Sequence, residues 1–235
     1  MPDFDFDAKV DELIASDWTG VTITHPYKIA ARTRAGDGMI AEAAHLAASN
    51  LLTFRPKTKG FNTDYTGFVG AWKATMGDAL PGKVAVAGAG GVAGAIVPAL
   101  VVLGASDITL WDPVPEAAEK MAELVGGPAR AIGMDESGDA TRDADGLVNA
   151  SALGMGDDRR SAFDTAAIGE QSWAFDAVYT PTQTTFLKAA ASQGLLAISG
   201  FDLFRHMILG SFEAYSGIRP DPVAMLPLID ALRPD

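Results

Sequence analysis

The pattern of hydrophobic and polar residues divides the chain into three regions, and the first ends near residue 80. In this region apolar residues recur first at helical spacing and then in short alternating runs. We predict a helix over Asp7–Ala15, a strand over Gly20–Thr24, a helix near Gly38–Ala48, paired strands at Leu51–Arg55 and Gly60–Asn62, and a helix around Tyr65–Met76. Pro81-Gly82 then marks a linker.

From Lys83 to about Ser199, short apolar runs alternate with helical patterns. The predicted strands are Val84–Ala87, Ile108–Asp112, Gly146–Asn149, Ala174–Val178 and Leu195–Ile198, and the predicted helices are Ala93–Leu103, Pro115–Leu124 and Thr185–Ser192. This alternation predicts a parallel sheet with helices on both faces. The tail, Phe201–Leu232, predicts one or two amphipathic helices.

The fold class that follows is α/β. We predict a small N-terminal α/β domain over residues 1–80. A doubly wound parallel-sheet domain of Rossmann type occupies residues 81–199, and C-terminal helices over 200–235 pack back on the first domain.

Composition narrows the function classes. A net charge of −12 opposes binding to nucleic acid or to an anionic membrane. The chain has no apolar run that could span a bilayer, and its acidic start, Met1 to Asp7, differs from the basic start of a signal peptide. It has no cysteine and no histidine pair at metal-ligand spacing, so we expect a cytoplasmic enzyme without a bound catalytic metal.

The stretch that follows Val84–Ala87 carries a glycine cluster, Gly88-Ala89-Gly90-Gly91-Val92-Ala93. In a dinucleotide-binding turn the first glycine permits the tight turn, the second lets the backbone approach the diphosphate, and a small third residue lets the helix pack on the strand. Free N–H groups at the helix N-terminus then bind the anion. We therefore predict cofactor contacts at Gly88, Gly90, Gly91 and Val92; the alternative is a glycine turn in another α/β protein.

The next strand ends in Asp112, about 20 residues after the glycine cluster, where a ribose-binding carboxylate is expected. A carboxylate accepts hydrogen bonds from ribose hydroxyls but repels a 2′-phosphate, so Asp112 favours NAD over NADP. The alternative is that Asp112 only begins the next helix, with Pro113 in its first turn.

Further segments resemble the shikimate/quinate dehydrogenase family. They are Gly20-Val21-Thr22-Ile23-Thr24-His25-Pro26-Tyr27-Lys28, Gly60-Phe61-Asn62-Thr63-Asp64-Tyr65-Thr66-Gly67-Phe68, Asn149-Ala150-Ser151-Ala152-Leu153-Gly154-Met155, Tyr179-Thr180-Pro181-Thr182-Gln183-Thr184, and Gly200 through Phe212 to Gly217. With the glycine cluster they follow the family's order from Gly20 to Gly217. The Thr-His-Pro-Tyr-Lys form and Asp112 are most similar to the NAD-using quinate/shikimate branch.

The resemblance implies that Lys28 and Asp64 are the catalytic pair beside the alcohol carbon that gives up hydride. Alcohol oxidation requires a base for the hydroxyl proton, and a desolvated lysine can serve. A neighbouring carboxylate opposes that change in the lysine pKa, so Asp64 is interpreted as orienting Lys28 and binding a substrate hydroxyl. The residue that finally carries the proton is either Lys28 or Asp64. The alternatives are a solvated lysine after a turn and an aspartate that caps the following helix.

The resemblance assigns other residues to ligands. Thr22, Thr24, Asn50, Tyr179 and Met207 are implied to face substrate. Asn149, Ser151, Leu153 and Gly200 are implied to lie on the nicotinamide side. Strand-end turns, core packing and a helix-entry turn are the structural alternatives for these positions.

Three features depart from the family's pattern and all concern the substrate pocket. No Ser-x-Ser motif precedes Gly20, Thr22 replaces an asparagine, and Met207 replaces a glutamine. We expect reversible NAD-dependent oxidation of a secondary alcohol on a cyclic hydroxy acid such as quinate or shikimate; the alternative is a non-catalytic NAD-binding regulator descended from such an enzyme. A shortened first domain also predicts an open sheet edge that a homodimer could cover.

Overall fold

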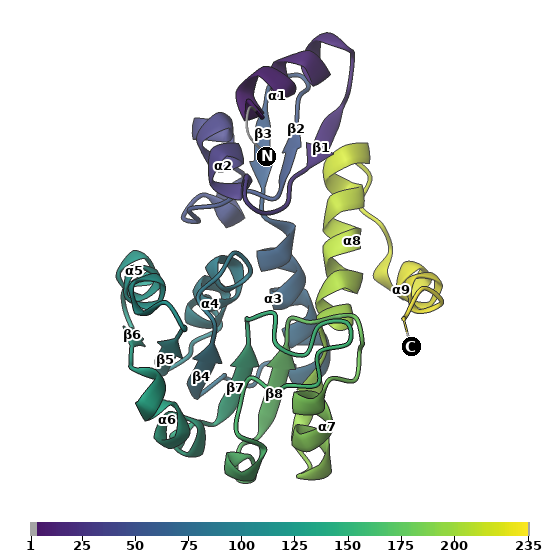
Figure 1. Ribbon diagram of the computed structural model, residues 1–235. Coiled ribbons are helices and arrows are strands. Elements are labelled where there is room, and N and C mark those ends of the chain that lie inside the picture. The colour runs from purple at the N-terminus through teal and green to yellow at the C-terminus, as the bar shows by residue number, and fades with distance from the viewer. Residues whose placement is uncertain (1–3, 235) are drawn as a thin grey trace.

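The computed structural model describes residues 4–234 and contains two β-sheets (Figure 1). Residues 1–3 and 235, at the ends of the predicted first and last regions, lie outside this range. The smaller sheet is antiparallel with strand order β1-β2-β3 and is formed by β1 (Gly20–Thr22), β2 (Leu51–Thr53) and β3 (Lys59–Phe61). The predicted strand pair is therefore confirmed, and β1 joins it.

Two helices pack with the small sheet, α1 (Phe6–Ala15) and α2 (Lys28–Ala35). The carboxylate of Asp5 caps α1 by accepting a hydrogen bond from the Ala8 N–H. Apolar side chains from both helices and from β2 then form a separate small core that includes Val10, Ala31 and Leu52.

The predicted helix at Gly38–Ala48 is wrong. The helix lies earlier, at Lys28–Ala35, and Gly36 ends it with a φ of +51°. Met39 and Ile40 are extended because they pair with β3: Met39 bridges Gly60, and the Ile40 N–H donates to the Gly60 carbonyl at 3.0 Å. Only a short 3₁₀ turn, Ala41–Ala43, remains of the helical pattern. Tertiary pairing overrides the helix propensity of this alanine-rich stretch.

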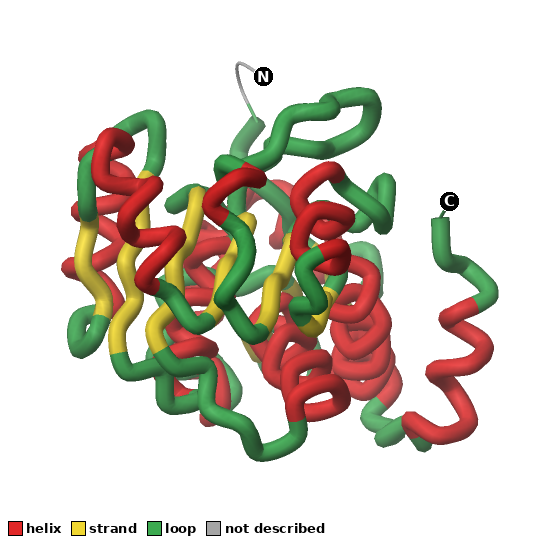
Figure 2. Tube along the Cα trace, turned by 90° about the horizontal axis from the view of Figure 1, so that it is seen from below, coloured by secondary structure: helices red, strands yellow, loops and turns green. Residues whose placement is uncertain are grey.

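The larger sheet is parallel, with strand order β6-β5-β4-β7-β8-β9. Its strands are β4 (Lys83–Ala87), β5 (Asp107–Trp111), β6 (Ala129–Ala131), β7 (Gly146–Asn149), β8 (Trp173–Asp176) and β9 (Leu196–Ile198). The helices α4 (Ala93–Val102), α5 (Pro115–Val125), α6 (Ser137–Asp143) and α7 (Thr185–Ser192) connect them, and Figure 2 shows helices on both sides of the row of strands. This order is that of a dinucleotide-binding fold, as predicted.

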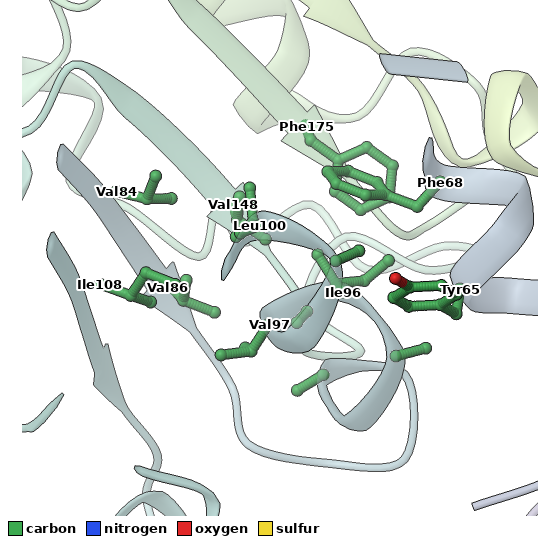
Figure 3. Close-up of a cluster of buried hydrophobic side chains, with 14 of the residues drawn as sticks. Tyr65, Phe68, Val84, Val86, Ile96, Val97, Leu100, Ile108, Val148 and Phe175 are labelled. Atoms are coloured by element: carbon green, nitrogen blue, oxygen red, sulfur yellow. The ribbon is translucent and has the colours of Figure 1, made fainter. Parts of the chain in front are cut away.

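The helix α3 (Thr63–Met76) links the two sheets, because it begins directly after β3 and packs on the parallel sheet (Figure 1). Figure 3 shows its Tyr65 and Phe68 beside Ile96 of α4 and Phe175 of β8. Val84, Val86, Ile108 and Val148 extend the same core across the sheet.

The last helices are α8 (Gly200–Ser216) and α9 (Pro222–Asp230). The backbones of α3 and α8 approach closely at Gly67, where an added Cβ would lie 3.0 Å from the Leu203 carbonyl oxygen and from the Met207 nitrogen. The far end of α8 reaches the small sheet through Tyr215. In Figure 1 the arrowheads of the parallel strands point toward the small sheet, so both sheets and α8 surround one region.

Candidate functional site

Lys28 and Asp64 form a direct ion pair between the two helices that follow β1 and β3. Lys28 is the first residue of α2, and Asp64 lies in the first turn of α3. The Lys28 Nζ donates to Asp64 Oδ2 at 2.7 Å, and the two side chains are 19% and 12% exposed. The pair is thus shielded while one side remains open to solvent. An ammonium group has three donors, so Lys28 keeps donors for a bound oxygen.

The start of α3 is fixed by buried amides. Asn62 caps the helix by accepting from the Tyr65 N–H at 3.1 Å, and it donates to the Ala48 carbonyl. Asn50 accepts from the Thr63 N–H at 2.7 Å and donates to Thr63 Oγ1 at 3.0 Å. Asn50, predicted to contact substrate, therefore holds the turn that places Asp64.

The other residues predicted to face substrate are not gathered in one cavity. Thr22 Oγ1 shares a hydrogen bond of 2.7 Å with the Tyr215 hydroxyl, and Thr24 is exposed. Tyr179 is 52% exposed and stacks on Phe204. Met207 packs against Gly67 of α3.

The glycine cluster contains two kinds of glycine. Gly88 has a φ of +100°, and an added Cβ would lie 2.8 Å from the Ser151 nitrogen, so the fold itself requires glycine there. An added Cβ at Gly90 would meet no atom within 4 Å. No contact with residues 4–234 therefore demands glycine at position 90, and the open space fits the close approach of a diphosphate to the backbone.

Asp112 lies beside this loop at the end of β5. Its Oδ2 accepts from the Ala89 N–H at 2.9 Å and its Oδ1 accepts from the Val114 N–H at 2.9 Å. Each carboxylate oxygen retains a further lone pair. Asp112 therefore shapes the loop and the next helix, and can still accept hydrogen bonds from ribose hydroxyls.

A cavity of about 590 Å³ opens at the carboxyl ends of the parallel strands. The predicted residues that line it are Gly88, Gly90, Gly91, Val92, Asp112, Ser151 and Tyr179. Asn149, Leu153 and Gly200 are not among its lining residues. Gly200 packs on the carbonyl groups of Ala177 and Val178, and an added Cβ would lie 2.5 Å from the Ala177 carbonyl oxygen. None of the lining residues found among 4–234 is Lys, Arg or His.

Seven lining residues were missed by the sequence predictions: Pro113, Ala150, Ala152, Met155, Ala177, Val178 and Thr180. Ala150, Ala152, Met155 and Thr180 belong to the quoted motifs, and the other three lie within two residues of Asp112 or Tyr179.

A buried hydrogen-bond network supports the part of this cavity that Ser151 and Val178 line. Asn149 Nδ2 donates to the Leu153 carbonyl and to Asp176 Oδ1, while its Oδ1 accepts from the Ser151 N–H and hydroxyl. Asp176 also accepts from the Val178 N–H and from the Thr184 hydroxyl. Burial raises the pKa of Asp176 to about 6, although these hydrogen bonds oppose the rise.

Over residues 4–234, no three His, Cys, Asp or Glu side chains are placed to share a metal ion. In the same part of the chain no helix is both long and apolar enough to cross a bilayer.

Known proteins resemble this chain along most of its length, although no family model matches it. A quinate/shikimate dehydrogenase (NAD(+)) of Corynebacterium efficiens is 33% identical over 219 residues, which cover 90% of this chain and 77% of that protein. The structure of quinate dehydrogenase from Corynebacterium glutamicum in complex with NAD matches with a TM-score of 0.89 and 30% identity, over 98% of this chain and 84% of that one. Shikimate 5-dehydrogenase from Thermus thermophilus, in complex with NADP(H) and shikimate, matches with a TM-score of 0.82 and 31% identity, over 96% and 83%.

Proposed function

Since the chain belongs to the shikimate/quinate dehydrogenase family, we propose that it catalyses the reversible, NAD-dependent oxidation of a secondary alcohol on a cyclic hydroxy acid such as quinate or shikimate. The observation that carries this proposal is the shielded Lys28–Asp64 ion pair, with 2.7 Å between Nζ and Oδ2. A regulator that only binds NAD would not require such a pair. The enzyme is therefore favoured over the non-catalytic alternative.

In this proposal the cofactor, when bound, accepts the hydride from the alcohol carbon. In the oxidation the Lys28 amine, with one N–H directed at Asp64, accepts the proton of the alcohol hydroxyl as the hydride departs and becomes an ammonium. Asp64 fixes the direction of the Lys28 side chain and offers its second oxygen to a substrate hydroxyl. In the reverse direction the Lys28 ammonium supplies the proton to the carbonyl oxygen.

The cavity beside the glycine cluster fits NAD. Gly90 leaves room at the helix N-terminus for the diphosphate, and Asp112 is placed to bind the ribose hydroxyls. A 2′-phosphate would meet the Asp112 carboxylate, with no lysine or arginine among the described lining residues to offset its charge.

The proposal is tested by NADH formation with quinate and with shikimate. We expect Lys28→Met to lower kcat by a factor of about 10² or more, because general acid–base groups contribute about 10²–10⁴. The dissociation constant for NAD should stay within about twofold of wild type, because in this proposal Lys28 makes no charge-assisted hydrogen bond to the cofactor. Lys57→Met is the matched control, because Lys57 is an exposed lysine on the loop between β2 and β3. Absence of turnover by the wild type, despite NAD binding, would favour the regulator.

A homodimer is part of the same proposal. β1 is an edge strand in the sheet formed by the described residues, and exposed edges are usually covered. Sedimentation equilibrium is expected to show a dimer, and a monomer across the accessible concentration range would exclude it.

A further inference from the structure

One residue of the substrate-side motifs has no role in the proposed reaction, and it lies against the cofactor loop. His25 belongs to the turn between β1 and α2, three residues before Lys28. A Cβ built on Gly91 would lie 4.0 Å from His25 Nδ1. The imidazole therefore faces the backbone of the glycine loop across the space between the two sheets.

The cavity beside His25 has no positively charged side chain, among its described lining residues, that could offset the charge of a bound diphosphate. A dinucleotide carries two phosphate charges, and this chain has a net charge of −12. The cavity at the glycine loop has no Lys, Arg or His among its described lining residues. Backbone N–H groups at the start of α4 supply donors there, but none of them carries a full charge.

The His25 side chain is accessible to a ligand. Its side chain is exposed, and between residues 4 and 234 it makes no side-chain hydrogen bond or ion pair. The ring therefore has both nitrogens free for an incoming anion. Its neighbours in the chain are constrained, because the Tyr27 N–H donates to the Thr24 carbonyl and Lys28 is held by Asp64.

We propose that His25 is a cofactor-binding residue that donates a hydrogen bond from the substrate side to the diphosphate of NAD. The inference rests on the proposed function. Because His25 and Lys28 share one short turn, cofactor binding would also hold the turn that presents the catalytic lysine. Bound NAD would then raise the affinity for substrate, and bound substrate would raise the affinity for NAD by the same factor.

The test compares three side chains at position 25 by calorimetric titration with NAD and with ADP-ribose, which keeps the diphosphate and lacks nicotinamide. His25→Phe retains a planar ring without donors, and we expect it to weaken both ligands by about tenfold, as for loss of one charge-assisted hydrogen bond. His25→Lys restores an N–H donor at this position and should bind both ligands within about threefold of wild type. Circular dichroism melting is run on all three proteins, and similar melting is expected because His25 is exposed.

Substrate kinetics separate this inference from the proposed function. At saturating NAD, His25→Phe should still turn over quinate or shikimate but with a higher KM for that substrate, because the bound cofactor no longer holds the turn that presents Lys28. If His25→Phe binds NAD and ADP-ribose as wild type does while both proteins turn over quinate or shikimate, the inference is wrong and the proposed function stands. If wild type binds no NAD, both are wrong.

Discussion

The glycine cluster offers a sharp test, because the structure predicts opposite consequences for two neighbouring glycines. Gly88→Ala should damage the fold. A left-handed conformation costs a residue with a Cβ about 1–2 kcal/mol, and overpacking against the Ser151 and Ala150 backbone adds about 1–3 kcal/mol. The total of about 2–5 kcal/mol corresponds to a fall in Tm of about 5–20 °C for a domain of this size.

Gly90→Ala should leave the fold intact and damage cofactor binding. Its φ is not in the left-handed region, and the added methyl group meets no atom within 4 Å. We expect its Tm to stay within about 2 °C of wild type, or to rise slightly as the unfolded chain loses freedom. The same methyl group enters the space of the diphosphate, and a clash of about 1–3 kcal/mol weakens NAD by about 10–100-fold.

The assay pairs thermal denaturation with calorimetric titration of NAD for each variant. Gly169→Ala is the matched control, because this loop glycine also has open space around its Cβ position and lies far along the chain from the cluster. It should change neither Tm nor NAD affinity. Unchanged NAD affinity in Gly90→Ala would refute the placement of the diphosphate at this loop, and an unchanged Tm in Gly88→Ala would refute the packing argument.

Three further expectations concern carboxylates. Asp64→Asn keeps an acceptor for Lys28 but removes the charge, so kcat should fall about hundredfold with NAD affinity unchanged; equal kcat would exclude Asp64 from the reaction. Asp112→Asn should narrow the preference for NAD over NADP by at least about tenfold, measured as the ratio of the two kcat/KM values, and an unchanged ratio would remove Asp112 from cofactor selection. Because burial raises the pKa of Asp176 to about 6 from an ordinary 3.8, the native state binds the proton more tightly than the unfolded chain does. The contribution of Asp176 to the free energy of unfolding should therefore decrease by about 3 kcal/mol as pH rises from about 4 to 6. Denaturant titrations of wild type should show this slope and those of Asp176→Asn should not; identical slopes would contradict it.

Sequence periodicity predicted most of the parallel sheet well, because β4, β5, β7 and β8 are largely buried and read as short apolar runs. β7 matches its predicted bounds, and β4 and β5 differ from theirs by one residue. β6 and α6 were missed. β6 is a three-residue edge strand with the sequence Ala-Arg-Ala, and α6 is polar, so neither has an apolar pattern to detect.

The site was predictable as motifs but not as contacts. Lys28 and Asp64 stand 36 residues apart, and their ion pair depends on α2 and α3 beginning at the same end of the small sheet, after its two edge strands β1 and β3. The alanine-rich stretch after Gly38 showed the limit of local propensity, since pairing of Met39 with Gly60 decided its conformation. The approach of His25 to Gly91 likewise depends on how the two sheets face each other, which no local pattern reports.

The most direct test is the distance from Lys28 Nζ to the reacting oxygen in a crystal structure with NAD and quinate or shikimate bound. We expect this distance to lie within about 2.7–3.2 Å, with Asp64 still paired to Lys28 and the nicotinamide at the carboxyl end of β7. A substrate bound elsewhere, with Lys28 and Asp64 facing only water, would contradict it.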